Sequence, residues 1–182
     1  MKSKNVVIGV TGGIAVYKAL DVITRLNKLG CNTFVIMTEN AQNFVCPLSF
    51  EILSKNPVVK GMFADKKNWE VEHISLAKKA DLFLIVPATA NIIGKVANGI
   101  ADDMLSTTIM ATEAPIVFAP AMNEKMYENR ILQANIAKLK NYGYHFIDPA
   151  AGMLACGDIG IGKLAKVDTI VEYVKNIMNR SE

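Results

Sequence analysis

The sequence has few of the features that mark secreted, metal-binding or membrane-spanning proteins. Its three cysteines, Cys31, Cys46 and Cys156, are odd in number, widely spaced and never arranged as CxxC. This predicts neither a disulfide framework nor a zinc site, and it favours a reducing cytoplasm. No apolar run reaches the roughly 20 residues of a membrane span, and no small-residue cleavage site follows the N-terminus. We therefore expect neither a signal peptide nor a membrane segment.

Blocks of like charge are also missing. The chain has 20 Lys and Arg against 17 Asp and Glu, a net charge of +3, and its basic residues run together only in pairs such as Lys66-Lys67. A scattered pattern of this kind indicates a solvated surface and disfavours nucleic-acid binding. With 182 residues, of which 51% are hydrophobic, we expect one domain covering residues 1–182.

Continuously apolar runs alternate with helical patterns along the chain. Strands that are apolar on both faces are typical of parallel sheets covered by helices, and crossovers between such strands are right-handed. The pattern predicts an α/β fold: a doubly wound, Rossmann or flavodoxin-like parallel sheet with helices on both faces. The expected strands are residues 5–10, 32–38, 81–89, 115–122 and 143–148. The expected helices are residues 14–30, about 40–54, about 91–111, 123–141 and 167–179, with an irregular segment at 56–72.

Segments rich in small polar residues follow the expected strands. Ligands of doubly wound sheets bind beyond the carboxyl ends of the strands. Because these ends share one edge, TGGIA, MTEN, PATANIIG, PAMN and the loop around Cys156 are predicted to lie together there.

The turn after the first expected strand contains Gly12 and Gly13. Backbone N–H groups and the helix dipole at such a turn can hold a phosphate, although the glycines could serve only to make the turn tight. The turn lacks GxGxxG spacing, and Thr38 rather than an acidic residue ends the second strand. Both departures disfavour an NAD site.

Other polar residues at this edge have two interpretations. Thr38, Thr89 and Asn91 could each contact a flavin or a phosphate, or each could cap a helix, which is the better explanation for any one alone. Ser106 has the same two interpretations. Asn123, in the first turn of a helix, can cap it or bind a substrate carboxylate through its amide.

The two histidines and two of the methionines also have a structural and a functional interpretation. His73 has a side chain suited to proton transfer near neutral pH, but a lone histidine is more often a surface or capping residue. His145 lies within an expected strand, which favours a structural role. Met122 and Met126, four residues apart, are expected in the core.

Glycines surround Cys156, at Gly157, Gly160 and Gly162. They disfavour a packed core, which leaves a nucleophile or an acid. A thiol with a pKa of about 8.5 is mostly protonated at neutral pH and can donate a proton. No oxyanion-hole motif or clear base accompanies Cys156, which disfavours a hydrolase.

In this order the motifs resemble one family. VTGGIAVYKA, the lone His73 ahead of ADLFLIVPATANIIGKVANGIADDML, then APAMN and LACG..G.GKLA, look like the homo-oligomeric flavin-containing cysteine decarboxylases. Within that family the pattern is most similar to stand-alone phosphopantothenoylcysteine decarboxylases. The resemblance runs from about residue 5 to about residue 165.

The resemblance implies a set of site residues and no metal. FMN contacts would come from Gly12, Gly13, Ile14, Thr38, Thr89, Asn91, Ser106 and Ala121. Substrate contacts would come from Asn123, Met153, Ala155, Lys163 and Leu164, with Asn123 on the substrate carboxylate. His73 would be the catalytic base. Cys156 would be the proton donor on a mobile clamp at about residues 148–166.

The chemistry implied by the resemblance is a redox-neutral decarboxylation. FMN would oxidise the thiol carbon of 4′-phosphopantothenoylcysteine to a thioaldehyde, carbon dioxide would leave to give an enethiolate, and hydride return with a proton from Cys156 would give 4′-phosphopantetheine. The resemblance also implies a homotrimer or a dodecamer of trimers, with FMN between subunits. We expect a cytoplasmic enzyme of coenzyme A biosynthesis whose synthetase is a separate chain.

Several alternatives remain open at this stage. A relative could oxidatively decarboxylate the C-terminal cysteine of a peptide, or act as a non-catalytic flavin-binding regulatory subunit. An NAD-dependent dehydrogenase is disfavoured by the missing fingerprint. A prenyltransferase that shares the flavin fold is a further alternative, but the PAMN and LACG segments are not expected in such a protein.

Overall fold

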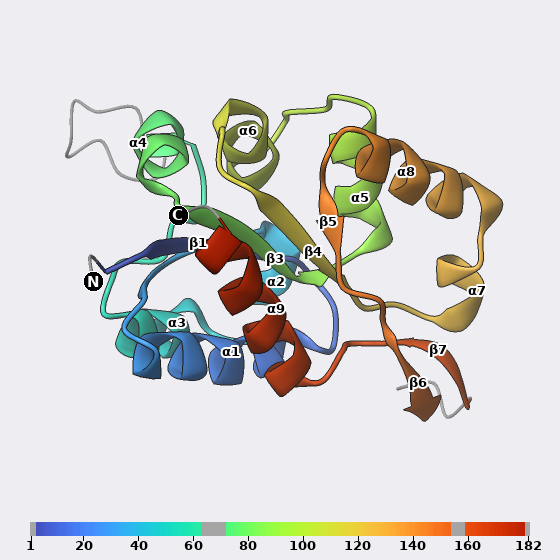
Figure 1. Ribbon diagram of the computed structural model, residues 1–182, viewed down its shortest axis with the longest axis horizontal. Coiled ribbons are helices and arrows are strands. Elements are labelled where there is room, and N and C mark those ends of the chain that lie inside the picture. Colours follow the sequence, from blue (N-terminus) through green and yellow to red (C-terminus); the bar gives the residue numbers. More distant parts are fainter. Residues whose placement is uncertain (1–2, 63–71, 154–158, 181–182) are drawn as a thin grey trace.

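Five parallel strands form the centre of the fold (Figure 1). The computed structural model describes residues 3–62, 72–153 and 159–180. The strands are β1 (Asn5–Val10), β2 (Asn32–Met37), β3 (Leu82–Ala88), β4 (Ile116–Pro120) and β5 (His145–Phe146), in the order β2-β1-β3-β4-β5. This is the strand order of flavodoxin-like sheets. The predicted fold class is confirmed, and the last strand is shorter than expected.

Helices cover both faces of the sheet because successive strand residues point to opposite sides. Val6, Ile8 and Val10 pack with α1 (Val16–Lys28), α3 (Pro47–Ser54) and α9 (Val167–Arg180). Val7 and Phe83 pack on the other side with α4 (Glu72–Lys79), α5 (Ala90–Ala97), α6 (Met104–Ala111) and α8 (Arg130–Asn141). Every residue of β3 is buried, as expected for a central strand with helices on both sides.

Three of the long expected helices are each divided in two. Residues 40–54 form α2 (Glu39–Gln42) and α3, which begins with Pro47 in its first turn, where the missing N–H of proline is tolerated. Residues 91–111 form α5 and α6. Residues 123–141 form α7 (Glu124–Tyr127) and α8, which begins after Asn129, whose Oδ1 accepts from the Ile131 N–H at 2.9 Å. Capping side chains and proline therefore set boundaries that apolar periodicity alone misses.

A second, two-stranded sheet replaces the glycine-rich loop expected near the C-terminus. β6 (Ala150–Met153) and β7 (Ile159–Lys163) pair antiparallel, and we call them the ribbon. Figure 1 shows the ribbon beside α7, and β7 and α7 are in contact. Glycines at three of its positions, which are poor strand formers, hid it from the sequence pattern.

No helix within the described ranges is both long enough and apolar enough to cross a membrane.

Candidate active site

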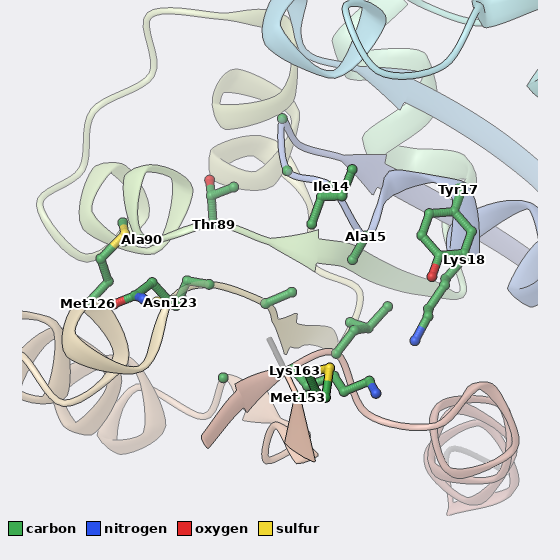
Figure 2. A pocket seen from close by; sticks show the side chains of 16 residues that line it. Ile14, Ala15, Tyr17, Lys18, Thr89, Ala90, Asn123, Met126, Met153 and Lys163 are labelled. Carbon is green, nitrogen blue, oxygen red and sulfur yellow. The ribbon is translucent and has the colours of Figure 1, made fainter. Parts of the chain in front are cut away.

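A cavity of about 650 Å³ opens where β1, β3 and β4 end (Figure 2). This volume lies within the range of small-molecule and cofactor sites, about 300–1,000 Å³. Its lining residues follow those three strands directly or belong to α1, α7 and the ribbon. They are Gly12, Gly13, Ile14, Ala15, Tyr17, Lys18, Thr89, Ala90, Ala121, Met122, Asn123, Met126, Met153, Gly162, Lys163 and Leu164. A cavity therefore lies at the predicted carboxyl edge of the sheet, and its role as the ligand site stays a prediction.

The glycine turn after β1 allows close packing on one side and open space on the other. A Cβ added to Gly12 would lie 2.5 Å from the Asn40 Cβ, so no side chain fits there. A Cβ added to Gly13 would meet only the Thr89 Cγ2, at 3.9 Å, so the backbone of Gly13 is open to the cavity. The N-cap residue of α1, Ala15, makes no side-chain cap, and the first turn carries no acidic residue. The geometry suits an anion at this helix start, as the phosphate hypothesis requires.

Thr11 joins the ends of β1 and β3 beneath the cavity. Its side chain is only 3% exposed, and its hydroxyl donates to the Pro87 carbonyl at 2.7 Å. The same oxygen accepts from the Thr89 N–H at 3.1 Å. The threonine of the TGG turn therefore holds Thr89 in place and does not itself line the cavity.

Replacing Thr11 with valine is expected to lower the free energy of unfolding by about 1–3 kcal/mol, because a buried N–H and a buried carbonyl lose their partner. Chemical denaturation measures the change. Thr169→Val, on the exposed part of α9, is the control and should change stability by less than about 0.5 kcal/mol. Equal stabilities for the two variants would show that the link contributes nothing.

Two predicted ligand residues line the cavity while capping helices. Thr89 caps α5 by accepting from the Ile92 N–H at 3.4 Å. Asn123 caps α7 through its Oδ1, which accepts from the Lys125 N–H at 2.9 Å. The cap and the binding role are therefore compatible for these residues. The cap to α5 uses a lone pair of the Thr89 hydroxyl oxygen and not its O–H, and the cap to α7 uses the Asn123 Oδ1 and not its amide N–H groups.

The ribbon forms the wall of the cavity that faces the sheet. The Met122 N–H donates to the Gly162 carbonyl at 2.9 Å, which joins β7 to the end of β4. Gly162 has φ of +147°, and a Cβ there would lie 2.3 Å from the Met122 carbonyl oxygen. Only glycine fits this approach. As a result Met153, Lys163 and Leu164 face the same cavity as Asn123.

The structure brings together most of the predicted site residues. Those that line the cavity are Gly12, Gly13, Ile14, Thr89, Ala121, Asn123, Met153, Lys163 and Leu164. Their individual roles stay predictions. Ala155 and Cys156 lie outside the described residues, as does part of the irregular segment expected at 56–72.

Four predicted residues do not line this cavity. Thr38 caps α2 by accepting from the Ala41 N–H at 3.4 Å, and Asn91 is exposed on α5. His73 lies in α4, which packs on α6. Figure 1 shows α4 and the ribbon at opposite corners of the molecule. Within one chain His73 therefore lies far from the ribbon, and its role as the base stays a prediction.

Ser106, the fourth of these, is 1% exposed and belongs to the start of α6. Its N–H donates to Asp103 Oδ1 at 2.8 Å, and its hydroxyl accepts from the Asp103 N–H at 3.1 Å. Burial alone would raise the pKa of Asp103, but hydrogen bonds from Lys95 and Ser106 lower it on balance. An ionised Asp103 thus holds this capping box, and a phosphate contact from Ser106 stays a prediction.

Sequence reasoning missed several lining residues. Met122 and Met126 were expected in the core; Met122 does pack on it but also faces the cavity, and Met126 is 50% exposed there. Tyr17 and Lys18 stand at the start of α1, four and five residues after Gly13, so their place one turn from the glycines was a usable signal. Gly162 was noted only as a flanking glycine.

The charge of the lining is one-sided. Among the lining residues there is no acidic side chain, and there are two lysines, Lys18 of α1 and Lys163 of β7. In Figure 2 both ammonium groups lie toward one end of the cavity, and Thr89 and Asn123 toward the other. An elongated ligand with an anion at each end fits this distribution.

Fold and site together define a flavodoxin-like α/β protein with a ligand cavity at the carboxyl edge of its sheet. A family model described as Flavoprotein matches residues 1–179. The chain belongs to the Flavoprotein family.

Similar proteins point in the same direction. The chain is 48% identical over 181 residues to "Coenzyme A biosynthesis bifunctional protein CoaBC" of Borreliella burgdorferi, a match covering 100% of this chain and 46% of that protein. It is 46% identical over 175 residues to "Probable phosphopantothenoylcysteine decarboxylase" of Streptococcus mutans, covering 95% and 98% of the two chains. The chain thus spans about half the length of the bifunctional relative.

Solved structures share the fold over the whole chain. A PPC decarboxylase variant with one cysteine replaced by serine, complexed with pantothenoylaminoethenethiol, has a TM-score of 0.86 at 26% identity, covering 98% of this chain and 100% of that one. The FMN-dependent cysteine decarboxylase SpaF has a TM-score of 0.85 at 27% identity, covering 99% and 97%.

Proposed function

We propose that the protein is a carboxy-lyase that decarboxylates 4′-phosphopantothenoylcysteine to 4′-phosphopantetheine with bound FMN, in coenzyme A biosynthesis. The names of the relatives from Borreliella and Streptococcus support this substrate and pathway. The observation that carries the proposal is the cavity itself. It offers Asn123 toward one end and two lysines toward the other, with no acidic lining residue, and the substrate has a carboxylate at one end and a phosphate at the other.

The residues present fit FMN. Gly13 leaves the turn open, the start of α1 presents backbone N–H groups without a side-chain cap, and apolar residues such as Ile14 and Ala121 offer a surface for a flat ring. Bound FMN would supply a hydride acceptor that also returns the hydride, so that the net reaction is redox-neutral.

In this proposal the side chains of the protein bind, orient and move protons. Asn123 holds the substrate carboxylate through its amide, with its orientation fixed by the cap to α7. His73 takes the proton of the substrate thiol, and Cys156 returns a proton to carbon at the end. The segment of about residues 148–166, whose described part is the ribbon, closes over the substrate and excludes water.

The position of His73 supports an oligomer in which sites form between subunits. Within one chain α4 is far from the cavity (Figure 1), so a base on α4 reaches bound substrate only from a second copy. We propose a homotrimer, alone or as a dodecamer of trimers, with FMN at the subunit boundary. The bifunctional relative from Borreliella carries a further region beyond the part that this chain matches. The compartment we propose is the cytoplasm, where reducing conditions keep the Cys156 thiol available.

The fold alone does not distinguish this substrate from a peptide. A structure named as the peptidyl-cysteine decarboxylase EpiD shares the fold with a TM-score of 0.82 at 24% identity. The two lysines favour the phosphorylated substrate.

The mass of the product tests the proposed function. Purified protein incubated with 4′-phosphopantothenoylcysteine should give a product that has lost carbon dioxide and nothing else. Loss of carbon dioxide together with two hydrogens would mean that the reduction is not completed. No reaction, from protein that carries flavin, would move the proposal to a peptide substrate or to a regulatory subunit.

Removing both lysines should weaken recognition of the phosphate. For Lys18→Ala/Lys163→Ala we expect KM for the phosphorylated substrate to rise about tenfold or more. Each hydrogen bond to a charged group contributes about 1.5–3 kcal/mol, and the loss of about 1.4 kcal/mol of binding energy is a tenfold change. KM for the substrate without phosphate should not change. Lys166→Ala, three residues beyond Lys163, exposed and outside the lining, is the control. An equal rise in KM for both substrates would exclude a phosphate contact.

A further inference from the structure

We propose that Glu124 is a positioning residue: its carboxylate seats the ribbon against the segment that carries Asn123. This rests on the proposed function for its catalytic consequence, although not for the contact itself. Glu124 does not line the cavity, so it acts through the residues that do.

Two hydrogen bonds join the ribbon to the chain segment after β4. The Met122 N–H donates to the Gly162 carbonyl at 2.9 Å, and the Ile161 N–H donates to Glu124 Oε1 at 3.1 Å. The ribbon is a separate two-stranded sheet with no pairing to the five-stranded one. An isolated two-stranded ribbon is marginally stable by itself, so its place depends on contacts of this kind.

Gly160 shows how closely the Glu124 carboxylate lies on β7. A Cβ added to Gly160 would be 2.2 Å from Glu124 Oε1 and 2.6 Å from Oε2. Gly160 does not have the positive φ that Gly152 and Gly162 have. A side chain at position 160 would therefore displace the Glu124 carboxylate, although the backbone conformation itself would accept it.

The contact connects two groups of cavity residues. Glu124 directly follows Asn123, the proposed carboxylate ligand, and it holds the strand that ends at Lys163. Its carboxylate therefore links α7, which follows Asn123, to β7, which ends at Lys163. By setting where β7 lies on α7, Glu124 sets the distance between the two ends of the substrate site.

Hydrogen exchange tests the contact without relying on activity. In Glu124→Ala, the peptide covering residues 159–164 should exchange at least about fivefold faster, because one N–H loses its acceptor and the strand its anchor. Peptides from β3 and β4 should be unchanged. Unchanged exchange at 159–164 would overturn the proposal whatever the activity shows.

Kinetics test the positioning role. We expect Glu124→Ala to raise KM about five- to tenfold while kcat changes less than about twofold, since substrate binding but not the proton transfers depends on the ribbon. Glu124→Gln keeps the acceptor oxygen and should stay within about twofold of the wild type. Glu128→Ala is the matched control at the C-cap of the same helix, because Glu128 is exposed and its Oε2 accepts from the Lys125 ammonium at 3.2 Å. A general loss of folding would instead lower the melting temperature and impair Glu124→Gln as well.

A double substitution gives the sharpest test. Gly160→Ala places a methyl group against the carboxylate, which must then move off β7, so it should raise KM about as much as Glu124→Ala does. In Glu124→Ala/Gly160→Ala the same contact is already lost, so KM should stay at that of Glu124→Ala alone. Effects that simply multiply would show that the two positions are independent and would overturn the proposal.

The proposed function can fail separately. If the wild type does not convert 4′-phosphopantothenoylcysteine, that function is wrong. Hydrogen exchange in Glu124→Ala still decides whether Glu124 holds the ribbon, because that measurement needs no turnover.

Discussion

Cys156→Ser is expected to release carbon dioxide but to accumulate a product two hydrogens lighter than phosphopantetheine. A serine hydroxyl is a far weaker acid than a thiol, whose pKa is about 8.5, so the last proton is not delivered. Mass spectrometry of the product gives the answer directly.

Cys46→Ser is the control for that substitution, because Cys46 is exposed and its side chain forms no cap to α3. It should give the saturated product at the wild-type rate. If Cys156→Ser also gave the saturated product at full rate, the proton would come from another group.

His73→Asn is expected to reduce turnover by about 10²- to 10⁴-fold, the usual contribution of a general base. FMN should stay bound, because His73 does not line the cavity in which we propose that FMN binds. Flavin absorbance of the purified variant and single-turnover rates measure the two effects. His145→Asn, at the other histidine, should keep turnover within about twofold. Loss of FMN from His73→Asn would make His73 structural.

The same substitution can report whether His73 acts between subunits. Asn123→Ala and His73→Asn each disable a different part of the site. When the two variants are mixed after dissociation, or co-expressed, hybrid oligomers contain some sites with both residues intact. Activity should reappear in the mixture. Two inactive variants that stay inactive together would place both residues in one chain.

The location of the site was predictable because parallel strands have all their carboxyl ends at one edge. Gly13, Thr89 and Asn123 are distant in sequence, yet each follows a buried strand, and all three line the same cavity. Apolar strand patterns therefore predicted the place without any side-chain geometry.

The roles of single polar residues were not predictable from sequence. A hydroxyl that helps to cap a helix and a hydroxyl that binds phosphate look the same in a sequence. Ser106 completes the capping box that Asp103 begins at α6, whereas Thr89 both caps α5 and lines the cavity. Tertiary packing decides between these outcomes. It also places His73 far from the cavity, which no periodicity reports.

The ribbon was missed for a related reason. Its strand-forming tendency is weak, and its place comes from contacts with residues almost forty positions earlier, such as that of Ile161 with Glu124. Contacts of this range leave no local signal.

The one-sided charge of the cavity lining also bears on how fast substrate arrives. Lys18 and Lys163 are the charged residues of the lining, and no carboxylate is among the lining residues, so the lining carries a net positive charge. Such a field guides a multiply charged anion during its approach, and dissolved salt shortens its reach to about 8 Å at physiological ionic strength. The encounter rate should therefore depend on the surrounding electrolyte as well as on diffusion, and an anionic ligand should be captured most efficiently when ionic strength is low.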